Sequence, residues 1–431
     1  MPASDPATPV TMDIKGRVAV VTIDSPPVNA LGHAVRSGVM AALDRAEADG
    51  AIDAVVIRGG GRCFSGGADI REFGTPPAEP TLRQLCARVE EFPKIVVAAL
   101  HATAFGGGLE LPLSCHYRIA DASAQIALPE VKLGIVPGSG GTQRLPRIIG
   151  AKRALKVILS GDPFSAKEAH DLGVLDAIVE GDLTDAAVAY ANKLVTDGAA
   201  LRKVRDLAVA DADAEVFAEA RKTWEKRSRG LLAPLACIDC VEIAATKPFD
   251  EGMQRERDIF VKCRDSEQSK AQRHLFFAER EAAKVKDVPR DTQKRPINTA
   301  AVVGCGTMGG GIAMCLANVG IPVTVLEMTA DALAVGMAKI EKNYAATVSK
   351  GRLSQNAMDR RMGLITGTTM YADLGAADIV IEAVFEDMDL KKTIFGELDK
   401  VMKPGAVLAT NTSTLDIDEI AAATKRPADV I

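Results

Sequence analysis

The chain is 431 residues long, nearly three times the ~150 residues of an average domain, which excludes a single small module and predicts two or three folding units. Hydrophobic residues make up 47% and charged residues 25% of the sequence, a composition that excludes wholesale disorder. The formal net charge of −5 provides no field that attracts polyanions, so we expect no nucleic-acid partner.

Targeting and redox signals are weak. The first ten residues have neither a basic n-region nor an apolar h-region, so nothing directs the chain to secretion. Eight cysteines are spread thinly, as is typical of reduced core thiols, and we expect a cytoplasmic protein. Cys237 and Cys240 form a C-x-x-C without a second pair or a His pair at zinc spacing. We therefore expect no metal site.

Predicted strands and helices alternate along the first 195 residues. Residues 18–23 and 54–57 are β-branched runs, and a helical pattern over 35–47 separates them, which indicates α/β layering. Between 196 and 295 glycines become rare, and charged residues interleave with apolar ones at helical spacing. This pattern predicts a helical extension and linker.

The uncharged segment 296–326 begins a second α/β unit. It is long enough for a membrane span of ~20 residues, but glycines, asparagines and a proline interrupt it, which favours a strand, a turn, a helix and a second strand. Later β-runs at 377–382 and 406–410 predict a doubly wound parallel sheet. We expect no membrane span and three regions, 1–195, 196–295 and 296–431.

Two glycine-rich turns follow β-runs in the first unit. One contains Gly66 and Gly67, and the other contains Gly107 within residues 106–108. Each turn could direct a backbone N–H at one oxygen, and a pair of such donors stabilises an oxyanion or enolate. The second turn leads into a predicted helix, whose positive N-terminal end would add to the effect.

Two glutamates accompany these turns. Glu110 lies three residues after Gly107, and Glu130 follows an apolar run. Burial there would raise a carboxyl pKa and let one group donate a proton while the other accepts. The alternative, commoner for a single glutamate, is that either residue caps a helix or pairs with Arg144.

Together these features resemble the crotonase (enoyl-CoA hydratase/isomerase) superfamily over roughly residues 12–190. The strongest stretches are 64–70, 106–111 and 129–145. The resemblance implies a ββα spiral fold for the first unit and a coenzyme A thioester as the substrate.

The resemblance also implies roles for individual residues. The backbone N–H groups of Gly66 and Gly107 would form the oxyanion hole, and Glu110 and Glu130 would hold a water and act as base and acid. The backbone of Ala68, Asp69 and Ile70 would lie against the CoA adenine.

The reaction that this resemblance implies is hydration of trans-2-enoyl-CoA to 3-hydroxyacyl-CoA in fatty acid β-oxidation, accompanied by 3-enoyl to 2-enoyl isomerisation. Two retained glutamates favour a hydratase, because superfamily members with other reactions often keep one or none. An isomerase only, or a thioesterase or dehalogenase with a nucleophilic carboxylate elsewhere, remains the alternative, combined with a non-catalytic NAD-binding module.

The second unit carries a dinucleotide-binding pattern. Gly304, Gly306 and Gly309 follow a predicted strand and open a predicted helix, and Glu327 ends the next strand. This context gives the pattern its specificity: the glycines allow a tight turn, backbone approach to a pyrophosphate and close packing, and the acidic residue meets the ribose. We expect NAD rather than NADP, held by these residues and by Thr307 and Met308.

Beyond this pattern the segment resembles the NAD-binding domain of L-3-hydroxyacyl-CoA dehydrogenases, through residues 381–386, Lys391 and 411–415. The resemblance implies that Ser413 hydrogen-bonds the substrate oxygen and that Glu386 and Lys391 lie beside the nicotinamide. Without it, a helix-cap serine and a surface charge pair would be the favoured interpretations.

Alcohol oxidation needs a base of near-neutral pKa, usually histidine. The five histidines of the chain all precede residue 296, and the family's catalytic His-Glu pair lies beyond the segment matched here. We expect NAD binding with dehydrogenation absent or very weak, and a chain that is a C-terminally truncated part of a longer enzyme.

The segment 269–284 resembles the linker helix of bifunctional β-oxidation enzymes, which join a hydratase to a dehydrogenase in this order. Arg273, Arg280 and Lys284 fall near one face of this predicted helix, where they would meet CoA phosphates or water. We expect an acyl-CoA as the small-molecule partner and a monomer or low-order oligomer.

Overall fold

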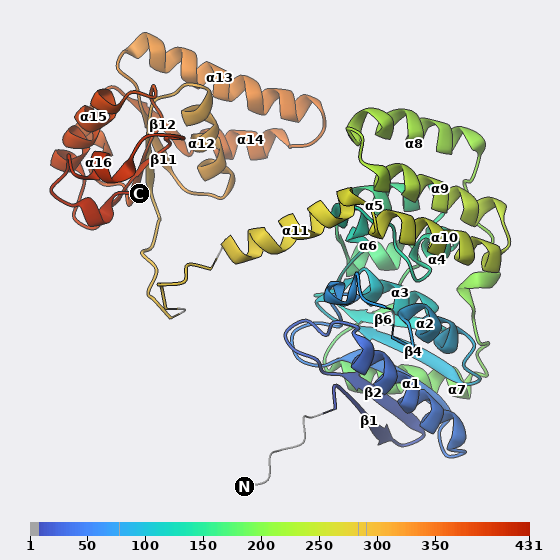
Figure 1. Ribbon diagram of the computed structural model, residues 1–431. Helices are drawn as coiled ribbons and strands as arrows, with labels where there is room; N and C mark the ends of the chain where they lie inside the picture. The colour runs from blue at the N-terminus through green and yellow to red at the C-terminus, as the bar shows by residue number, and fades with distance from the viewer. Residues whose placement is uncertain (1–7, 77, 283, 290) are drawn as a thin grey trace, which may run out of the picture. The chain divides into compact units, whose positions relative to one another are not determined.

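The computed structural model describes residues 8–76, 78–282, 284–289 and 291–431. The chain divides into two compact units, Met1–Val285 and Lys286–Ile431, coloured blue to yellow and yellow to red in Figure 1. The expected division at 195 and 295 remains a prediction about domain boundaries.

The first unit is built on a mostly parallel sheet of strand order β1-β2-β3-β4-β6-β9. The β1 strand is antiparallel to β2, and the remaining neighbours are parallel. A smaller sheet has the order β5-β7-β8. Their strands are β1 (Val10–Lys15), β2 (Val18–Ile23), β3 (Ala54–Gly59), β4 (Ile95–Leu100), β5 (Thr103–Phe105), β6 (Tyr117–Asp121), β7 (Gln125–Ala127), β8 (Phe164–Ser165) and β9 (Ala177–Val179).

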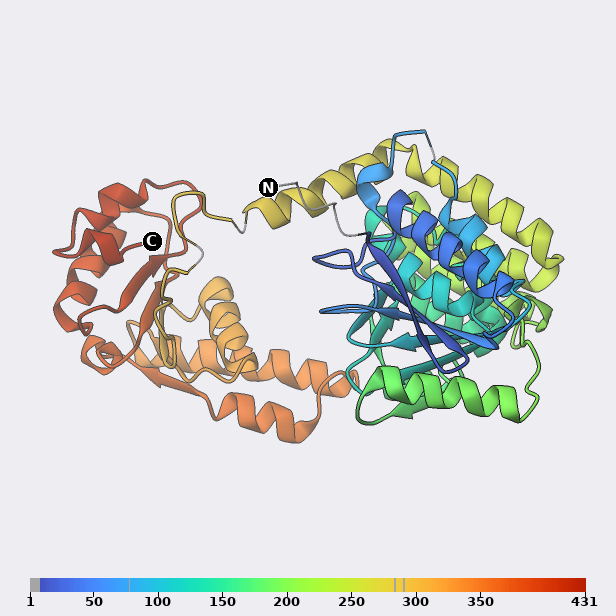
Figure 2. The ribbon, with the colours of Figure 1, turned by 90° about the horizontal axis from the view of Figure 1, so that it is seen from below.

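Helices cover both faces of the larger sheet, as Figure 2 shows. On one face α7 packs through Ala187 and Ala191 against residues of β2, β3 and β4. The main core lies on the other face. The helices are α1 (His33–Ala48), η1 (Ile70–Glu72), α2 (Leu82–Glu90), α3 (Gly107–Ser114), η2 (Pro129–Leu133), α4 (Gly141–Ile149), α5 (Ala151–Ser160), α6 (Ala166–Asp171), α7 (Leu183–Thr196) and η3 (Val204–Asp206).

The strands of this sheet read as continuous apolar runs because both faces are buried. All of Ile95–Leu100 is buried, for example. The α/β class expected for this region is therefore confirmed, with the layering that the sequence pattern indicates.

The helical region after residue 200 belongs to the first unit. It comprises α8 (Ala214–Arg227), α9 (Leu232–Thr246), α10 (Phe249–Arg264) and α11 (Glu267–Ala282). The α9 helix packs against α4, α5 and α10, and Cys237, Ile238 and Val241 join the main core. The segment expected as an extension thus completes the apolar core around the site described below.

The start of α11 is also attached to this unit. The Ser269 hydroxyl donates a hydrogen bond of 3.0 Å to the Leu133 carbonyl at the end of η2. Ser269 is fully buried, so this end of the helix is fixed on the first unit.

The second unit is a doubly wound parallel sheet of strand order β12-β11-β10-β13-β14. The order reverses between β10 and β13, where ligands bind in such sheets. Its elements are β10 (Ala300–Val303), α12 (Thr307–Asn318), β11 (Val323–Leu326), α13 (Ala330–Ser349), α14 (Gln355–Met362), β12 (Ile365–Thr368), η4 (Tyr371–Leu374), β13 (Ile379–Glu382), α15 (Met388–Val401), β14 (Val407–Thr410), α16 (Ile417–Ala421) and η5 (Pro427–Asp429).

The uncharged run 296–326 is confirmed as a strand, turn, helix and strand, since it forms β10, α12 and β11. Over the described ranges, no helix is both long and apolar enough to cross a membrane.

Candidate active site and dinucleotide site

The two glycine turns of the first unit lie side by side because Ser65 forms a parallel bridge with Ala104. At Gly67 φ is +106°, and an added Cβ would lie 2.7 Å from the Phe105 carbonyl oxygen. A Cβ on Gly107 would lie 3.1 Å from the Ala68 nitrogen. Only glycine allows the two backbones to approach this closely.

The hydrogen bonds of these turns correct one expectation. The Gly66 N–H donates to the Val28 carbonyl at 2.7 Å, so it is not free to hold a substrate oxygen. Among the described residues, the N–H groups of Ala68 and Gly107 have no acceptor. Gly107 begins α3, where the first N–H groups of a helix lack internal partners. Ala68 and Gly107 therefore each provide an N–H group without an acceptor, one at each turn.

Glu110 lies in the first turn of α3 and is 3% exposed. Its Oε1 accepts hydrogen bonds from the backbone N–H groups of Ser139 at 2.7 Å and Gly141 at 2.9 Å. Burial raises the pKa of Glu110, while these donors and the charge of Arg144 oppose the rise. Glu110 is thus a buried carboxyl group with partial stabilisation of its charged form.

Glu130 lies in η2, where it is 8% exposed. Its Oε2 is buried and has no hydrogen-bond partner among the described residues. A Cβ on Gly106 would lie 2.9 Å from Glu130 Oε1, so the carboxyl group sits directly over the second glycine turn. Burial, and then the charge of Glu110, raise the pKa of Glu130 well above its usual value. Burial and the neighbouring carboxylate thus both favour the protonated form of Glu130.

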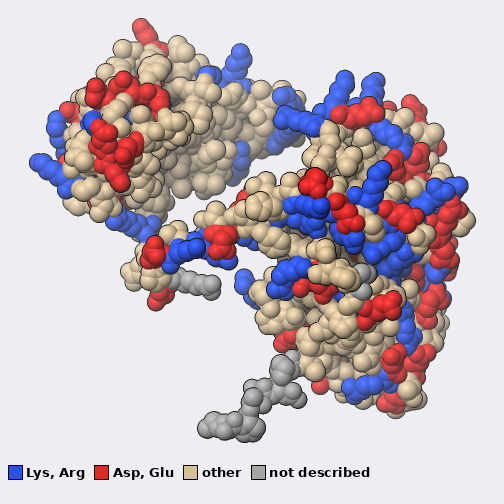
Figure 3. Space-filling view, viewed as in Figure 1, with Lys and Arg blue, Asp and Glu red and all other residues tan. Residues whose placement is uncertain are grey.

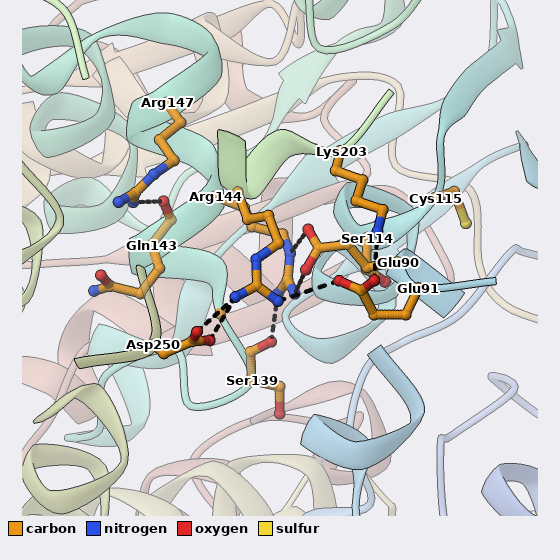
Figure 4. A network of polar contacts seen from close by, with 12 residues as sticks. Glu90, Glu91, Ser114, Cys115, Ser139, Gln143, Arg144, Arg147, Lys203 and Asp250 are labelled. Atoms are coloured by element: carbon orange, nitrogen blue, oxygen red, sulfur yellow. Dashed lines mark hydrogen bonds and ion pairs between the residues drawn. The ribbon is translucent and has the colours of Figure 1, made fainter. Parts of the chain in front are cut away.

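Arg144 does not pair with either glutamate. Its guanidinium forms hydrogen bonds of 3.0 and 2.8 Å with the carboxylate of Glu90, and both side chains are 1% exposed. A further bond of 3.1 Å runs from Arg144 Nη1 to the Ser139 carbonyl (Figure 4). The ion pair thus anchors the turn whose N–H groups hold Glu110.

A third buried carboxyl group, Glu256 of α10, was not among the residues expected at the site. It accepts hydrogen bonds from the N–H groups of Gly140 at 2.7 Å and Thr142 at 3.1 Å and from the Thr142 hydroxyl. Burial raises the pKa of Glu256 to about 8. Only its helical spacing with buried Met253 and Phe260 could have marked it as inward-facing.

Glu110 and Glu130 line one cavity of about 650 Å³. Its lining includes both glycine turns, Glu110, Glu130 and the expected adenine-contact residues Ala68, Asp69 and Ile70. The Asp69 side chain accepts from the Arg71 N–H and so caps η1. Arg83 of α2 and Arg257 and Arg264 of α10 also line the cavity.

The C-x-x-C lies within α9, where Cys237 and Cys240 are buried free thiols. Burial raises the pKa of both. Within the described part of the chain, no three His, Cys, Asp or Glu side chains gather as a metal site would require.

In the second unit Gly304 and Gly306 occupy the turn between β10 and α12, and Gly309 lies in the first turn of α12. Gly304 has φ of +100°, and a Cβ on Gly309 would lie 1.8 Å from the Gly304 carbonyl oxygen. Gly306 precedes α12, and a Cβ on it would meet nothing within 4 Å. The space in front of the helix N-terminus fits a dinucleotide pyrophosphate, which Thr307 and Met308 would meet through backbone N–H groups.

Glu327 follows β11 at the same edge of the sheet. Its Oε1 accepts from the Cys305 N–H at 2.6 Å, and its Oε2 from the Met328 N–H at 3.2 Å. The carboxylate therefore lies beside the glycine turn, where it could accept from ribose hydroxyls.

Glu386 and Ser413 meet at the ends of β13 and β14. Glu386 Oε1 accepts from the Ser413 N–H at 2.9 Å and from the Thr412 hydroxyl at 2.6 Å. These bonds lower the pKa of Glu386 to about 2. The contacts of both residues with substrate and cofactor remain proposals.

Lys391 lies in a buried ion pair. Its side chain is fully buried, and its Nζ lies 2.8 Å from both carboxylate oxygens of Glu382 and 3.5 Å from Glu386. A buried ammonium needs a carboxylate partner, and Glu382, which the sequence analysis did not select, provides it. Lys391 thus belongs to a buried ion pair rather than a surface pair, while its place beside the nicotinamide remains a proposal.

Comparisons with known proteins agree with both units. Residues 13–228 match the family model described as enoyl-CoA hydratase/isomerase, and residues 299–431 match 3-hydroxyacyl-CoA dehydrogenase, NAD binding domain. The first match covers half of the chain. The protein belongs to the enoyl-CoA hydratase/isomerase family and also carries a dehydrogenase-type NAD-binding domain.

Similar curated proteins align along nearly the whole of this chain. The peroxisomal bifunctional enzyme of Danio rerio is 42% identical over 96% of this chain and 58% of its own length. The enzyme of that name from Homo sapiens is 39% identical over 96% and 58%. A peroxisomal fatty acid beta-oxidation multifunctional protein of Arabidopsis thaliana is 35% identical over 95% and 59%. The chain thus spans less than two thirds of these relatives.

These names contradict the expected cytoplasmic location, since the relatives are called peroxisomal or glyoxysomal. The expectation was wrong because it rested on reduced thiols and the lack of a secretion signal. Neither feature distinguishes the cytosol from an organelle that folded proteins enter through a receptor-read address.

Proposed function

We propose that the first unit hydrates trans-2-enoyl-CoA to 3-hydroxyacyl-CoA. The observation that carries this proposal is the asymmetry of two buried carboxyl groups on one cavity: Glu110 accepts two N–H donors, whereas Glu130 Oε2 accepts none. Such a pair supplies one base and one acid at neutral pH.

In the proposed reaction the thioester oxygen accepts hydrogen bonds from the Ala68 and Gly107 N–H groups, which polarise the enoyl system. A water held by the two carboxyl groups attacks C3 and gives a proton to Glu110. The electrons of the C2–C3 double bond move to the enolate, and the Glu130 proton then transfers to C2. Proton exchange with water afterwards restores a charged Glu110 and a neutral Glu130.

The same two carboxyl groups would support isomerisation. One removes a proton from C2 of a 3-enoyl thioester, the enolate is held by the two N–H groups, and a proton returns at C4. The double bond moves into conjugation with no net change in composition.

Basic residues at the cavity favour a phosphate-bearing substrate. Lys and Arg side chains gather on the face of the first unit seen in Figure 3. Arg257 lies near enough to Arg83 and Arg264 for their charges, after the larger effect of burial, to lower its pKa. We propose that Arg83 and Arg257 meet the CoA phosphates while the Ala68–Ile70 backbone lies beside the adenine.

For the second unit we propose NAD binding at the N-terminus of α12, with Glu327 on the ribose. When bound, NAD supplies a hydride acceptor for 3-hydroxyacyl-CoA, the product of the first unit. Glu386 orients the 412–414 loop through its hydrogen bonds, and Ser413 would hold the substrate oxygen there. By analogy with its named relatives, we propose that the protein acts in peroxisomal β-oxidation.

The test of hydration is product identity. The chain is incubated with a short trans-2-enoyl-CoA in H₂¹⁸O, and the thioester products are weighed by mass spectrometry. We expect a 3-hydroxyacyl-CoA with one ¹⁸O at C3, absent with Glu110→Gln. Free CoA and an enoic acid that carries ¹⁸O in its carboxylate would indicate a thioesterase instead.

A further inference from the structure

Successive backbone N–H groups of the turn over residues 139–142 donate alternately to two different carboxyl groups, Glu110 and Glu256. Its first and third N–H groups donate to Glu110 at 2.7 and 2.9 Å. Its second and fourth N–H groups donate to Glu256 at 2.7 and 3.1 Å. Any movement of the Glu256 carboxyl group therefore moves the peptide units that hold Glu110.

Glu256 itself is firmly held. Its side chain is fully buried in α10, and the Thr142 hydroxyl donates to it as well. That hydroxyl also accepts from the Gln143 amide at 3.0 Å, and the amide bonds the Cys240 carbonyl of α9. The helices α9 and α10 and the start of α4 thus share one hydrogen-bonded network.

We propose that Glu256 is a positioning residue of the hydratase site, which fixes the 139–142 turn and through it the Glu110 carboxylate. The inference rests on the proposed hydration. It also assigns α10, which lies beyond the 13–228 family match, a part in the site.

The burial of a third acid supports this role. An apolar side chain at position 256 would leave the N–H groups of Gly140 and Thr142 buried without acceptors, which destabilises the turn. The Gly140 N–H donates to Oε1 of Glu256 and the Thr142 N–H to Oε2, so a glutamine, which keeps one of these oxygens, retains only one of the two bonds in this geometry. The two substitutions should therefore disturb the turn to different degrees.

Glu256 also acts electrostatically on the site. The titratable and charged groups that interact with it are Glu110 of α3, Glu130 of η2, Arg144 of α4 and the thiols Cys237 and Cys240 of α9. A charged Glu256 raises the pKa of Glu130. Its removal therefore lowers the pKa of Glu130, and a reaction that needs protonated Glu130 would then stop at lower pH.

The experiment compares the full chain with Glu256→Gln, Glu256→Ala and the control Glu251→Gln, the same change on the exposed side of α10. Hydration of a short enoyl-CoA is followed from pH 5 to 10, and hydrogen exchange of residues 139–142 is followed by mass spectrometry. We expect Glu256→Ala to lower kcat about 10- to 100-fold with little change in KM, because a displaced base loses its near-attack geometry.

We further expect a smaller loss of kcat in Glu256→Gln, and an alkaline limb shifted to lower pH by on the order of half a unit in both variants. Exchange at 139–142 should rise in Glu256→Ala, and Glu251→Gln should match the wild type. If Glu256→Ala does not fold, the alkaline limb of the pH profile of Glu256→Gln tests the proposal.

The proposal would be overturned if kcat, the alkaline limb of the pH profile and hydrogen exchange at residues 139–142 were all unchanged in Glu256→Gln and Glu256→Ala. A change in KM without a change in kcat would also overturn it. Failure of the wild type to hydrate enoyl-CoA would instead reject the proposed function, and the exchange data would still report whether Glu256 fixes the turn.

Discussion

Glu110 and Glu130 face one cavity but differ in what holds them: two backbone N–H groups bind Glu110, and no donor reaches Oε2 of Glu130 among the described residues. Both are buried. Burial alone would push both carboxyl groups toward the neutral form, so the donors decide which of them ionises first.

The first prediction concerns pH. The pKa of Glu130 is raised well above its usual value and that of Glu110 is raised, so hydration should follow a bell-shaped profile. Activity rises as the base ionises and falls as the acid loses its proton with increasing pH; the two limbs belong to the coupled pair. The measurement is kcat/KM from pH 5 to 10. A profile with no alkaline limb would contradict the assignment.

The second prediction concerns the oxyanion hole. In Gly107→Ala the new Cβ would lie 2.6 Å from Leu82 Cδ2 and 3.1 Å from the Ala68 nitrogen, which displaces one donor. We expect kcat to fall about 10²- to 10³-fold, as when a single oxyanion donor is lost. Gly50→Ala, where an added Cβ meets nothing within 4 Å, is the matched control. Equal activity in both variants would reject this site for the oxyanion.

The third prediction concerns the CoA phosphates. Arg257→Gln removes one cavity charge and should raise KM for an acyl-CoA several-fold, with kcat nearly unchanged and a weaker dependence of KM on salt. Arg255→Gln is the control, because Arg255 pairs with Glu251 on the same helix. If Arg257→Gln keeps the KM of the wild type, the CoA phosphates do not bind at Arg257.

The fourth prediction concerns the buried Glu90–Arg144 pair. Removing one partner in Glu90→Gln leaves an uncompensated buried guanidinium and should lower the free energy of unfolding by about 3–5 kcal/mol. The exposed Lys167–Asp171 pair provides the comparison, where Asp171→Asn should cost less than about 1 kcal/mol. Urea denaturation measures both. Similar losses would mean that burial does not set the strength of the inner pair.

The fifth prediction concerns the second unit. Since an added side chain at Gly306 meets open space, Gly306→Val should fold normally yet weaken NAD binding at least tenfold by blocking the α12 N-terminus. Gly311→Ala, also unobstructed, should bind as the wild type does. Titration calorimetry measures both. Because residues 296–431 contain no histidine, we expect this chain to bind NAD without forming NADH from 3-hydroxyacyl-CoA.

Much of this arrangement could be predicted from the sequence. The glycine spacing around Gly304 and the apolar runs predict the α/β class of both units, because turns and buried parallel strands leave strong local signals in a sequence. Glu110 and Glu130 could be selected because each lies beside a turn or an apolar run.

The remaining features depend on contacts between distant segments. The sequence alone does not show whether Gly66 or Ala68 provides the free N–H group. The structure does, because the Gly66 N–H donates to the Val28 carbonyl. The sequence likewise does not show that the Lys391 side chain is buried and paired with Glu382. Glu256 lies over 100 residues from the turn it holds, so its helical spacing could mark it as buried but could not reveal its partner.

The most direct test of the proposed chemistry is the initial rate at which the conjugated enone of a short trans-2-enoyl-CoA disappears, measured for the wild type and for Glu130→Gln at one pH near neutral. The acid role predicts rapid loss of the enone with the wild type and a rate at least 10²-fold lower with Glu130→Gln, since an amide cannot donate the proton to C2. Equal rates for the two proteins would contradict it.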